Sequence, residues 1–213
     1  MPRVRPGRWR LVATKEGYAP GEAVVEVAGG SPTEVEIPMT PTEGVTFEVV
    51  LESGFHLRTV QVTILDPSGR RLAGGLYPVV DGRVRVATVP PGLWELVVQG
   101  GDGAATRFPV SSPGDQGRFV LPTAGMLHLR VPELETEMVA SVVLTGPDGK
   151  PLIPVSGTAW GPVGDRWPMR LGQATISGLA PGVWSFTVQH PDGRAWSGSA
   201  TVAPGAATEV SLP

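Results

Sequence analysis

Three copies of one short segment decide the fold: PGRWRLVA from Pro6, PGLWELVV from Pro91 and PGVWSFTV from Pro181. Proline and glycine followed by tryptophan and alternating apolar residues are typical of a turn that opens a β-strand. The second copy starts 85 residues after the first, and the third starts 90 residues after the second. Each copy leads to a closing segment, VEIP, FVLP or VSLP, so the segment belongs to a longer repeated unit.

The upstream halves of the last two units also align. TVQVTILDPSGRRL from Thr59 matches VASVVLTGPDGKPL from Val139 at an offset of 80. RVRVATVPPG from Arg83 matches QATISGLAPG from Gln173 at an offset of 90. The offsets differ by about ten residues, which predicts an inserted loop over residues 156–168 of the last unit.

These alignments divide the chain into one partial unit and two full ones. We predict the C-terminal half of a unit over residues 1–39, a full unit over 44–122, and a full unit with the inserted loop over 125–213. The linkers between them, TPTEG and TAG, are short. We therefore expect a semi-rigid array of units.

Within the units, apolar and polar residues alternate as half-buried strands require. Val60, Val62 and Ile64 share one face of a predicted strand, for example. About seven such runs lie between turns in each full unit. The predicted fold is all-β, with tandem seven-stranded antiparallel β-sandwiches of the immunoglobulin-like or prealbumin-like kind and an incomplete first unit.

One tryptophan marks the signature strand of each unit. Trp9, Trp94 and Trp184 each share a face with the apolar residue two positions further on. Because alternate residues of a strand point the same way, we predict that each tryptophan fills the core of its own sandwich.

Composition and charge narrow the classes of function. With 29 glycines, 23 prolines and 41% hydrophobic residues, the chain suits short strands and turns around a core, and long helices are not expected. A net charge of −3 offers nucleic acid no basic surface. The lack of cysteine excludes disulfides and Cys-based zinc sites. The lack of asparagine suits a thermophilic protein, although a GC-rich genome would also favour the excess of arginine over lysine.

Nothing in the sequence predicts a membrane span or a secretion signal. No apolar run approaches the roughly 18 residues that a spanning helix needs, and the first residues, MPRVRPGRWR, contain no apolar stretch. If the protein is exported, we expect its signal to have been encoded upstream.

The repeats resemble a known family of domains. ILDPSGRRLAGG, VDGRVRVATVPPGLWELVVQG and the closing segment 110–122 are similar to the carboxypeptidase regulatory-like domain, a transthyretin-like (prealbumin-like) sandwich. The last unit fits through GPDGKPL and LAPGVWSFTVQHPDG but lacks the Asp-Gly before its fourth strand. The resemblance implies an accessory, non-catalytic module of secreted and cell-surface proteins, used as a spacer, docking or ligand-binding repeat.

Catalytic and metal-binding patterns are missing from the sequence. His56, His128 and His190 have no partner at metal-ligand spacing, and no nucleophile elbow, phosphate-binding loop or dinucleotide fingerprint occurs. We therefore expect no enzyme activity, no cofactor and no metal.

Three glutamates, Glu133, Glu135 and Glu137, alternate in PELETEM and would share one side of an extended chain. Calcium could collect their oxygens, but no Asp-x-Asp-x-Gly loop accompanies them. A charged edge strand is the simpler interpretation.

The inserted loop carries the one candidate binding site, made of Trp160, Asp165 and Trp167. Tryptophan pairs can stack on sugar rings, so one hypothesis is a contact with a surface polysaccharide or a protein. The alternative is that the loop folds back and its tryptophans cover the end of the sandwich.

Residues 1–39 hold only about the last three strands of a unit, which cannot close a sandwich. Either the missing strands precede them in a longer array, or a neighbouring molecule supplies them by strand addition and builds a surface filament. The leading hypothesis for function is a non-catalytic stalk, spacer or assembly unit, extracellular or at the cell surface. Its partners would be adjacent domains or copies of itself.

Overall fold

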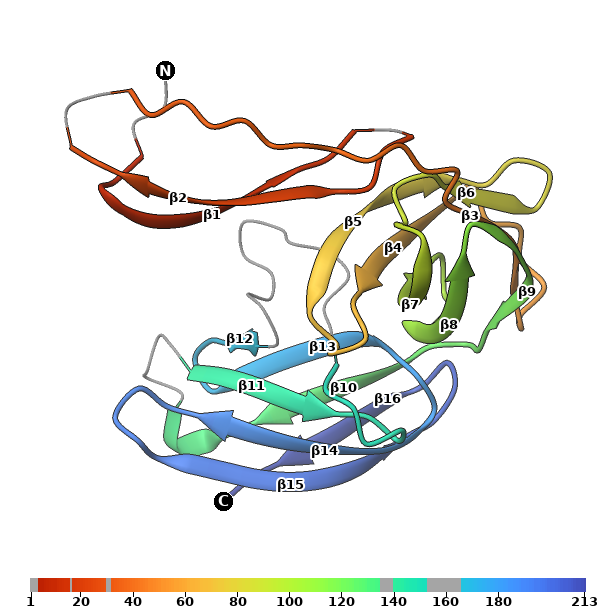
Figure 1. Ribbon diagram of the computed structural model, residues 1–213. Coiled ribbons are helices and arrows are strands. Elements are labelled where there is room, and N and C mark those ends of the chain that lie inside the picture. Colours follow the sequence, from red (N-terminus) through yellow and green to blue (C-terminus); the bar gives the residue numbers. More distant parts are fainter. Residues whose placement is uncertain (1–3, 16, 30–31, 135–139, 153–165) are drawn as a thin grey trace.

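The computed structural model describes residues 4–15, 17–29, 32–134, 140–152 and 166–213. These residues form sixteen β-strands, one short 3-10 helix and no α-helix (Figure 1). The predicted all-β fold is confirmed. In strands such as Val45–Leu51 and Gln173–Leu179, alternate side chains form one buried face, and glycines supply the positive φ angles of many connecting turns.

The second unit is a complete sandwich of seven strands. They are β3 (Val45–Leu51), β4 (Thr59–Leu65), β5 (Arg71–Pro78), β6 (Arg83–Val86), β7 (Gly92–Gln99), β8 (Thr106–Ser112) and β9 (Gly114–Leu121). One sheet has the order β5-β4-β7-β8 and the other β6-β3-β9. All neighbouring strands are antiparallel except β3 and β9, which are parallel. These two are the first and last strands of the unit, so no tight turn has to join them.

The third unit repeats this topology. Its elements are β10 (Gly125–Arg130), the 3-10 helix η1 (Pro132–Leu134), β11 (Ala140–Thr145), β12 (Arg166–Met169), β13 (Gln173–Leu179), β14 (Gly182–Gln189), β15 (Ala195–Val202) and β16 (Ala207–Ser211). The sheets have the orders β12-β11-β14-β15 and β13-β10-β16. β10 and β16 are the parallel pair. The prediction of tandem seven-stranded sandwiches is confirmed.

The inserted segment ends earlier than its sequence suggested. Residues 153–165 lie outside the described part of the chain. Arg166, Trp167 and Pro168 were predicted to be loop, but they belong to β12 and pair with β11. Trp167 lies opposite Val142 there and packs against the third core.

The first unit contains a single hairpin, β1 (Gly7–Ala13) with β2 (Gly21–Val27). The third strand predicted for it is absent, because residues 32–40 form no strand. In the complete units the closing strand pairs with the first strand of the same unit, and the described residues of the half-unit include no equivalent of that first strand. β1 is equivalent to β7 and β14, which pair on one side with β4 and β11, respectively. On that side, β1 has no described partner.

Each complete unit has its own hydrophobic core between its two sheets. In the second unit, Phe119 of β9 stacks on Phe47 of β3 at 4.4 Å and on Phe108 of the opposite sheet at 4.0 Å, measured between ring centroids. The third unit buries a comparable set of large side chains: Leu127, Leu129, Leu134, Leu144, Met169, Ile176 and Leu179. Two separate cores allow each sandwich its own stability.

Candidate functional site

The three signature tryptophans lie in three different environments. Trp184 is 4% exposed within the third core, Trp94 is half-buried against the second core, and Trp9 is 40% exposed. Trp9 therefore belongs to no core, because no sheet of the described residues forms a sandwich with β1 and β2. Its indole N–H donates to the Arg5 carbonyl at 2.9 Å, a local contact that compensates little for the exposed ring.

Of the predicted binding residues, only Trp167 lies in the described part of the chain. Trp160 and Asp165 lie outside it. Trp167 is half-buried and packs against the third core, and its shielded Nε1 has no acceptor among the described residues. Both alternatives for the inserted loop, binding by the three residues and covering of the sandwich end, therefore stay predictions.

The described residues contain no cluster of side chains that could hold a metal ion. His56, His128 and His190 lie in separate places, and no group of three or more histidines, cysteines and acidic residues gathers in that part of the chain. Glu133 is exposed in η1, whereas Glu135 and Glu137 lie outside the described ranges. Nor does any described helix have the length and hydropathy to cross a bilayer.

The feature that sequence reasoning missed is the junction between units. Before the second unit, the backbone N–H of Ala19 donates to the carbonyl of Thr40 at 2.7 Å, and the N–H of Thr42 donates to the carbonyl of Gly17 at 2.9 Å. This antiparallel pair of bonds ties the linker to the β1–β2 loop. The linker is therefore a docked segment and not a free tether.

The junction before the third unit repeats this pair of bonds. The N–H of Ala104 donates to the carbonyl of Pro122 at 2.8 Å, and the N–H of Ala124 donates to the carbonyl of Asp102 at 2.8 Å. The loop between β7 and β8 thus holds the second linker as the β1–β2 loop holds the first. Equivalent backbone bonds at both junctions give the units the same mode of attachment.

Charged side chains join the strand pair of the second unit to a turn of the third. Glu95 of β7 accepts from Arg107 of β8 at 2.7 Å and from Lys150, in the turn after β11, at 2.5 Å. Arg107 lies 3.8 Å from Asp148 of that turn and donates to the Pro151 carbonyl at 2.7 Å. Burial acts to raise the pKa of Glu95, but the hydrogen bonds from Lys150 and Arg107 outweigh it and the pKa is lowered.

The half-unit is joined to the second unit by a corresponding set of charges. Arg10 of β1 forms hydrogen bonds with Glu22 of β2, and Arg70, in the turn after β4, lies 3.9 Å from Glu22. The pKa of Arg10 is raised mainly by Glu22, and the carboxylate of Asp66 in the same turn contributes. The repeat offsets show in the sequence which charged residues are equivalent. They do not show that the turn docks on the strand pair, so these contacts could not be predicted.

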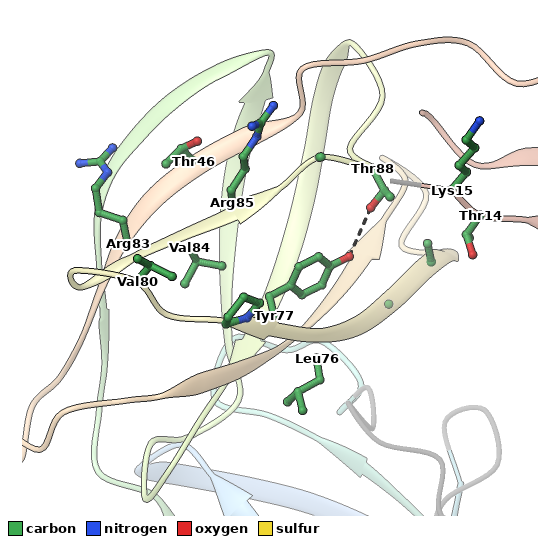
Figure 2. A pocket seen from close by; sticks show the side chains of 14 residues that line it. Thr14, Lys15, Thr46, Leu76, Tyr77, Val80, Arg83, Val84, Arg85 and Thr88 are labelled. Carbon is green, nitrogen blue, oxygen red and sulfur yellow. Dashed lines mark hydrogen bonds between the residues drawn. The ribbon is translucent and has the colours of Figure 1, made fainter. Parts of the chain in front are cut away.

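A hollow of about 680 Å³ opens where the half-unit meets the second unit (Figure 2). It lies between β5 and β6, the edge strands of the two sheets. Tyr77 borders it and its hydroxyl lies 3.3 Å from that of Thr88. Three cationic residues, Lys15, Arg83 and Arg85, are among the described residues that line it, and none of those is acidic.

At the second junction, the residues that correspond to Thr14 and Thr88 of the hollow lie close together. Gln99 packs closely against Gly178, and the N–H of Ala105 donates to the Gly178 carbonyl at 3.0 Å. The repeat offsets put Thr14, Pro20 and Thr88 at these places in the first junction. Proline has no N–H and threonine is shorter than glutamine, so neither the bond nor the packing forms.

The edge strands also differ beside Tyr77, which borders the hollow. Gly75 of β5 pairs with Val62, and Trp167 of β12 pairs with Val142, the residue equivalent to Val62. A glycine therefore stands next to Tyr77 in the second unit where an indole packs against the core of the third.

No protein-family model matches this chain, and no curated protein sequence matches it. The TIE protein of Bacillus anthracis is 13% identical with a TM-score of 0.33 over 92% of this chain, which spans 39% of that protein. The shaft pilin SpaA of Lactobacillus rhamnosus GG is 12% identical with a TM-score of 0.32, over 80% of this chain and 96% of the pilin. A streptococcal ancillary pilin is 13% identical with a TM-score of 0.30, over 98% and 75%. These similarities assign neither a family nor a function, and the resemblance to carboxypeptidase regulatory-like domains stays a prediction.

Proposed function

We propose that this chain is a non-catalytic spacer in a secreted or cell-surface protein, built of β-sandwich units that dock on one another in a fixed orientation. The observation that supports this best is the recurrence of one junction. Both linkers are pinned by the same two backbone bonds, and a charged turn reaches back to the strand pair of the preceding unit at both places. Domains of one chain move relative to each other unless contacts hold them, so these contacts favour a spacer of set length.

Distances between spin labels test the proposal. The chain has no cysteine, so two cysteines at a time can be introduced and spin-labelled without background. The exposed positions Glu26, Arg118 and Ser199 are suitable, one in each unit. We expect electron–electron double resonance to give one narrow distance distribution for Glu26 with Arg118 and one for Arg118 with Ser199. A flexible Gly-Ser insertion after Thr123 serves as the control and should broaden only the second. Broad distributions in the native chain would contradict a spacer of fixed geometry.

The hollow of the second unit favours a second function, the binding of an acidic oligosaccharide. Its described lining combines the Tyr77 ring and threonine hydroxyls, which suit a sugar, with Lys15, Arg83 and Arg85, which suit a carboxylate. Arg83 already pairs with Asp115 at 2.5 Å, so Arg85 is the cation assigned to the ligand. This site differs from the inserted loop that the sequence suggested.

Binding of trigalacturonate, with maltotriose as the uncharged comparison, checks this second function. We expect Arg85→Glu to weaken trigalacturonate binding at least about tenfold, since it replaces attraction by repulsion. Gly75 does not itself line the hollow, but a Cβ at this position would lie 3.5 Å from the Tyr77 ring that borders it, so the indole of Gly75→Trp should crowd Tyr77 and abolish binding. Arg118→Glu on β9 is the matched control. Equal affinity for the two sugars, or unchanged binding by Gly75→Trp, would exclude the site.

Strand complementation of the half-unit stays a prediction. The open edge of β1 is the place where a further strand would pair, as β4 pairs with β7.

A further inference from the structure

The two junctions carry opposite charge orders on equivalent positions of the strand pair. The repeat offset of 85 places Arg10 at the position of Glu95, and Glu22 at the position of Arg107. The strand registers agree, because Gly7 pairs with Val27 as Gly92 pairs with Ser112. The first strand is therefore positive and the second negative in the half-unit, and the reverse holds in the second unit.

The turns that dock on these strand pairs differ in a matching way. At the offset of 80, Arg70 and Lys150 are equivalent and both are basic. The acidic residue stands at different positions in the two turns. It is the first residue, Asp66, in the turn after β4, and the third residue, Asp148, in the turn after β11. Both turns close with the same backbone bonds, Gly69 N–H to the Asp66 carbonyl at 2.8 Å and Gly149 N–H to the Gly146 carbonyl at 3.0 Å.

In the second junction the turn's acid lies beside the arginine of the strand pair, with Asp148 3.8 Å from Arg107, and the turn's Lys150 is 2.5 Å from Glu95. In the first junction Asp66 is held within its own turn, where it accepts from the Ser68 N–H at 2.9 Å and from the Arg70 side chain at 3.0 Å. Arg70 also lies 3.9 Å from Glu22 of the strand pair.

We propose that these charges form a docking code, in which the strand pair of each unit accepts the turn of its own successor and rejects the turn of the other junction. The inference rests on the proposed spacer and adds how the order of units is specified. Because Asp148 lies beside Arg107, whose equivalent is Glu22, a turn with its acid at the third position would place a carboxylate beside Glu22. A turn with its acid at the first position would leave Arg107 without the carboxylate of Asp148. Like charges brought together in this way disfavour a wrong partner.

The third unit supplies an internal contrast. Its strand pair has Ser185 and Ser197 at the two equivalent positions, so it carries neither charge order. Its β14–β15 loop is a tight turn in which Asp192 accepts from the backbone of Arg194 at 2.9 Å. The code is thus a property of the two junctions and not of the fold.

An exchange of charges in the first junction tests the code, using labels at Glu26 and Arg118 in the full chain. Arg10→Glu with Glu22→Arg gives the half-unit the other charge order, and we expect the distance distribution to broaden to at least about twice its native width. Adding Asp66→Gly and Ser68→Asp converts the turn to the other type and should restore the native width. The two turn substitutions alone should broaden it as well. Gly146 and Asp148 already stand at these positions in the other turn, so the converted turn has a natural precedent in this chain.

We expect a charge exchange in the second junction to broaden the distance distribution more than one in the first, because the side chains of Glu95 and Arg107 are only 20% and 15% exposed. Glu95→Arg with Arg107→Glu should broaden the distances between Arg118 and Ser199, while far-UV circular dichroism stays unchanged. A narrow native distribution that no exchange broadens would overturn the code and leave the spacer intact. A broadened strand-pair variant that the converted turn fails to narrow would also overturn it. A broad native distribution would remove the spacer itself.

Discussion

Trp184→Ala should lower the free energy of unfolding of the third unit by about 3–5 kcal/mol. The indole comes from β14, is 4% exposed and packs in the third core. Its Nε1 donates to the Ala180 carbonyl at 2.7 Å, so truncation leaves both a cavity and a carbonyl without its donor. Urea denaturation of the full chain, followed through NMR signals of each unit, measures the loss.

Trp9→Ala is the matched control, since it removes the same side chain from the same position of the repeat. Trp9 is 40% exposed in the half-unit. We expect its removal to change stability by no more than about 1 kcal/mol. A loss as large as that of Trp184→Ala would show that a facing sheet covers β1 in solution.

Gly44→Ala should destabilise the second unit by at least about 3 kcal/mol, through backbone strain and overlap together. Gly44 adopts a φ of +68°, which alanine disfavours. A Cβ there would lie 2.1 Å from the carbonyl oxygen of Val86 and 2.6 Å from the Cα of Ala87. Both are backbone atoms at the end of β6, so relief would require β3 and β6 to separate. Urea denaturation of the same chain would show the effect.

Gly54→Ala separates the two causes. Gly54 has a similar φ of +78°, but no atom lies within 4 Å of the place its Cβ would take. Only the conformational cost remains, and we expect about 1 kcal/mol. Equal losses at Gly44 and Gly54 would mean that β6 yields to the added methyl group.

The strand content and the units followed from local pattern. The strands that begin at the Pro-Gly-Trp segments, and the strands that precede the turns after β4 and β11, could be predicted from the sequence. Alternation and turn residues act over a few neighbouring positions, so a short window contains the whole signal. The position of β12 did not follow, since the glycine-rich stretch before it hid a strand that forms only by pairing Trp167 with Val142. The closing segment of the half-unit differs for the opposite reason: its sequence is strand-like, but residues 32–40 pair with no first strand among the described residues.

The sequence alone determined that this protein is a run of repeated sandwiches, because turn chemistry and apolar alternation are local and recur at fixed offsets. Tertiary structure alone decided how the units meet. The partners Glu95 and Lys150 are far apart in sequence, and the residue equivalent to Glu95 in the other junction is Arg10, of opposite charge, so no local pattern marks the contact. The exposure of Trp9 was likewise decided by what lies opposite it, because burial of a side chain depends on a second sheet as well as on its own strand.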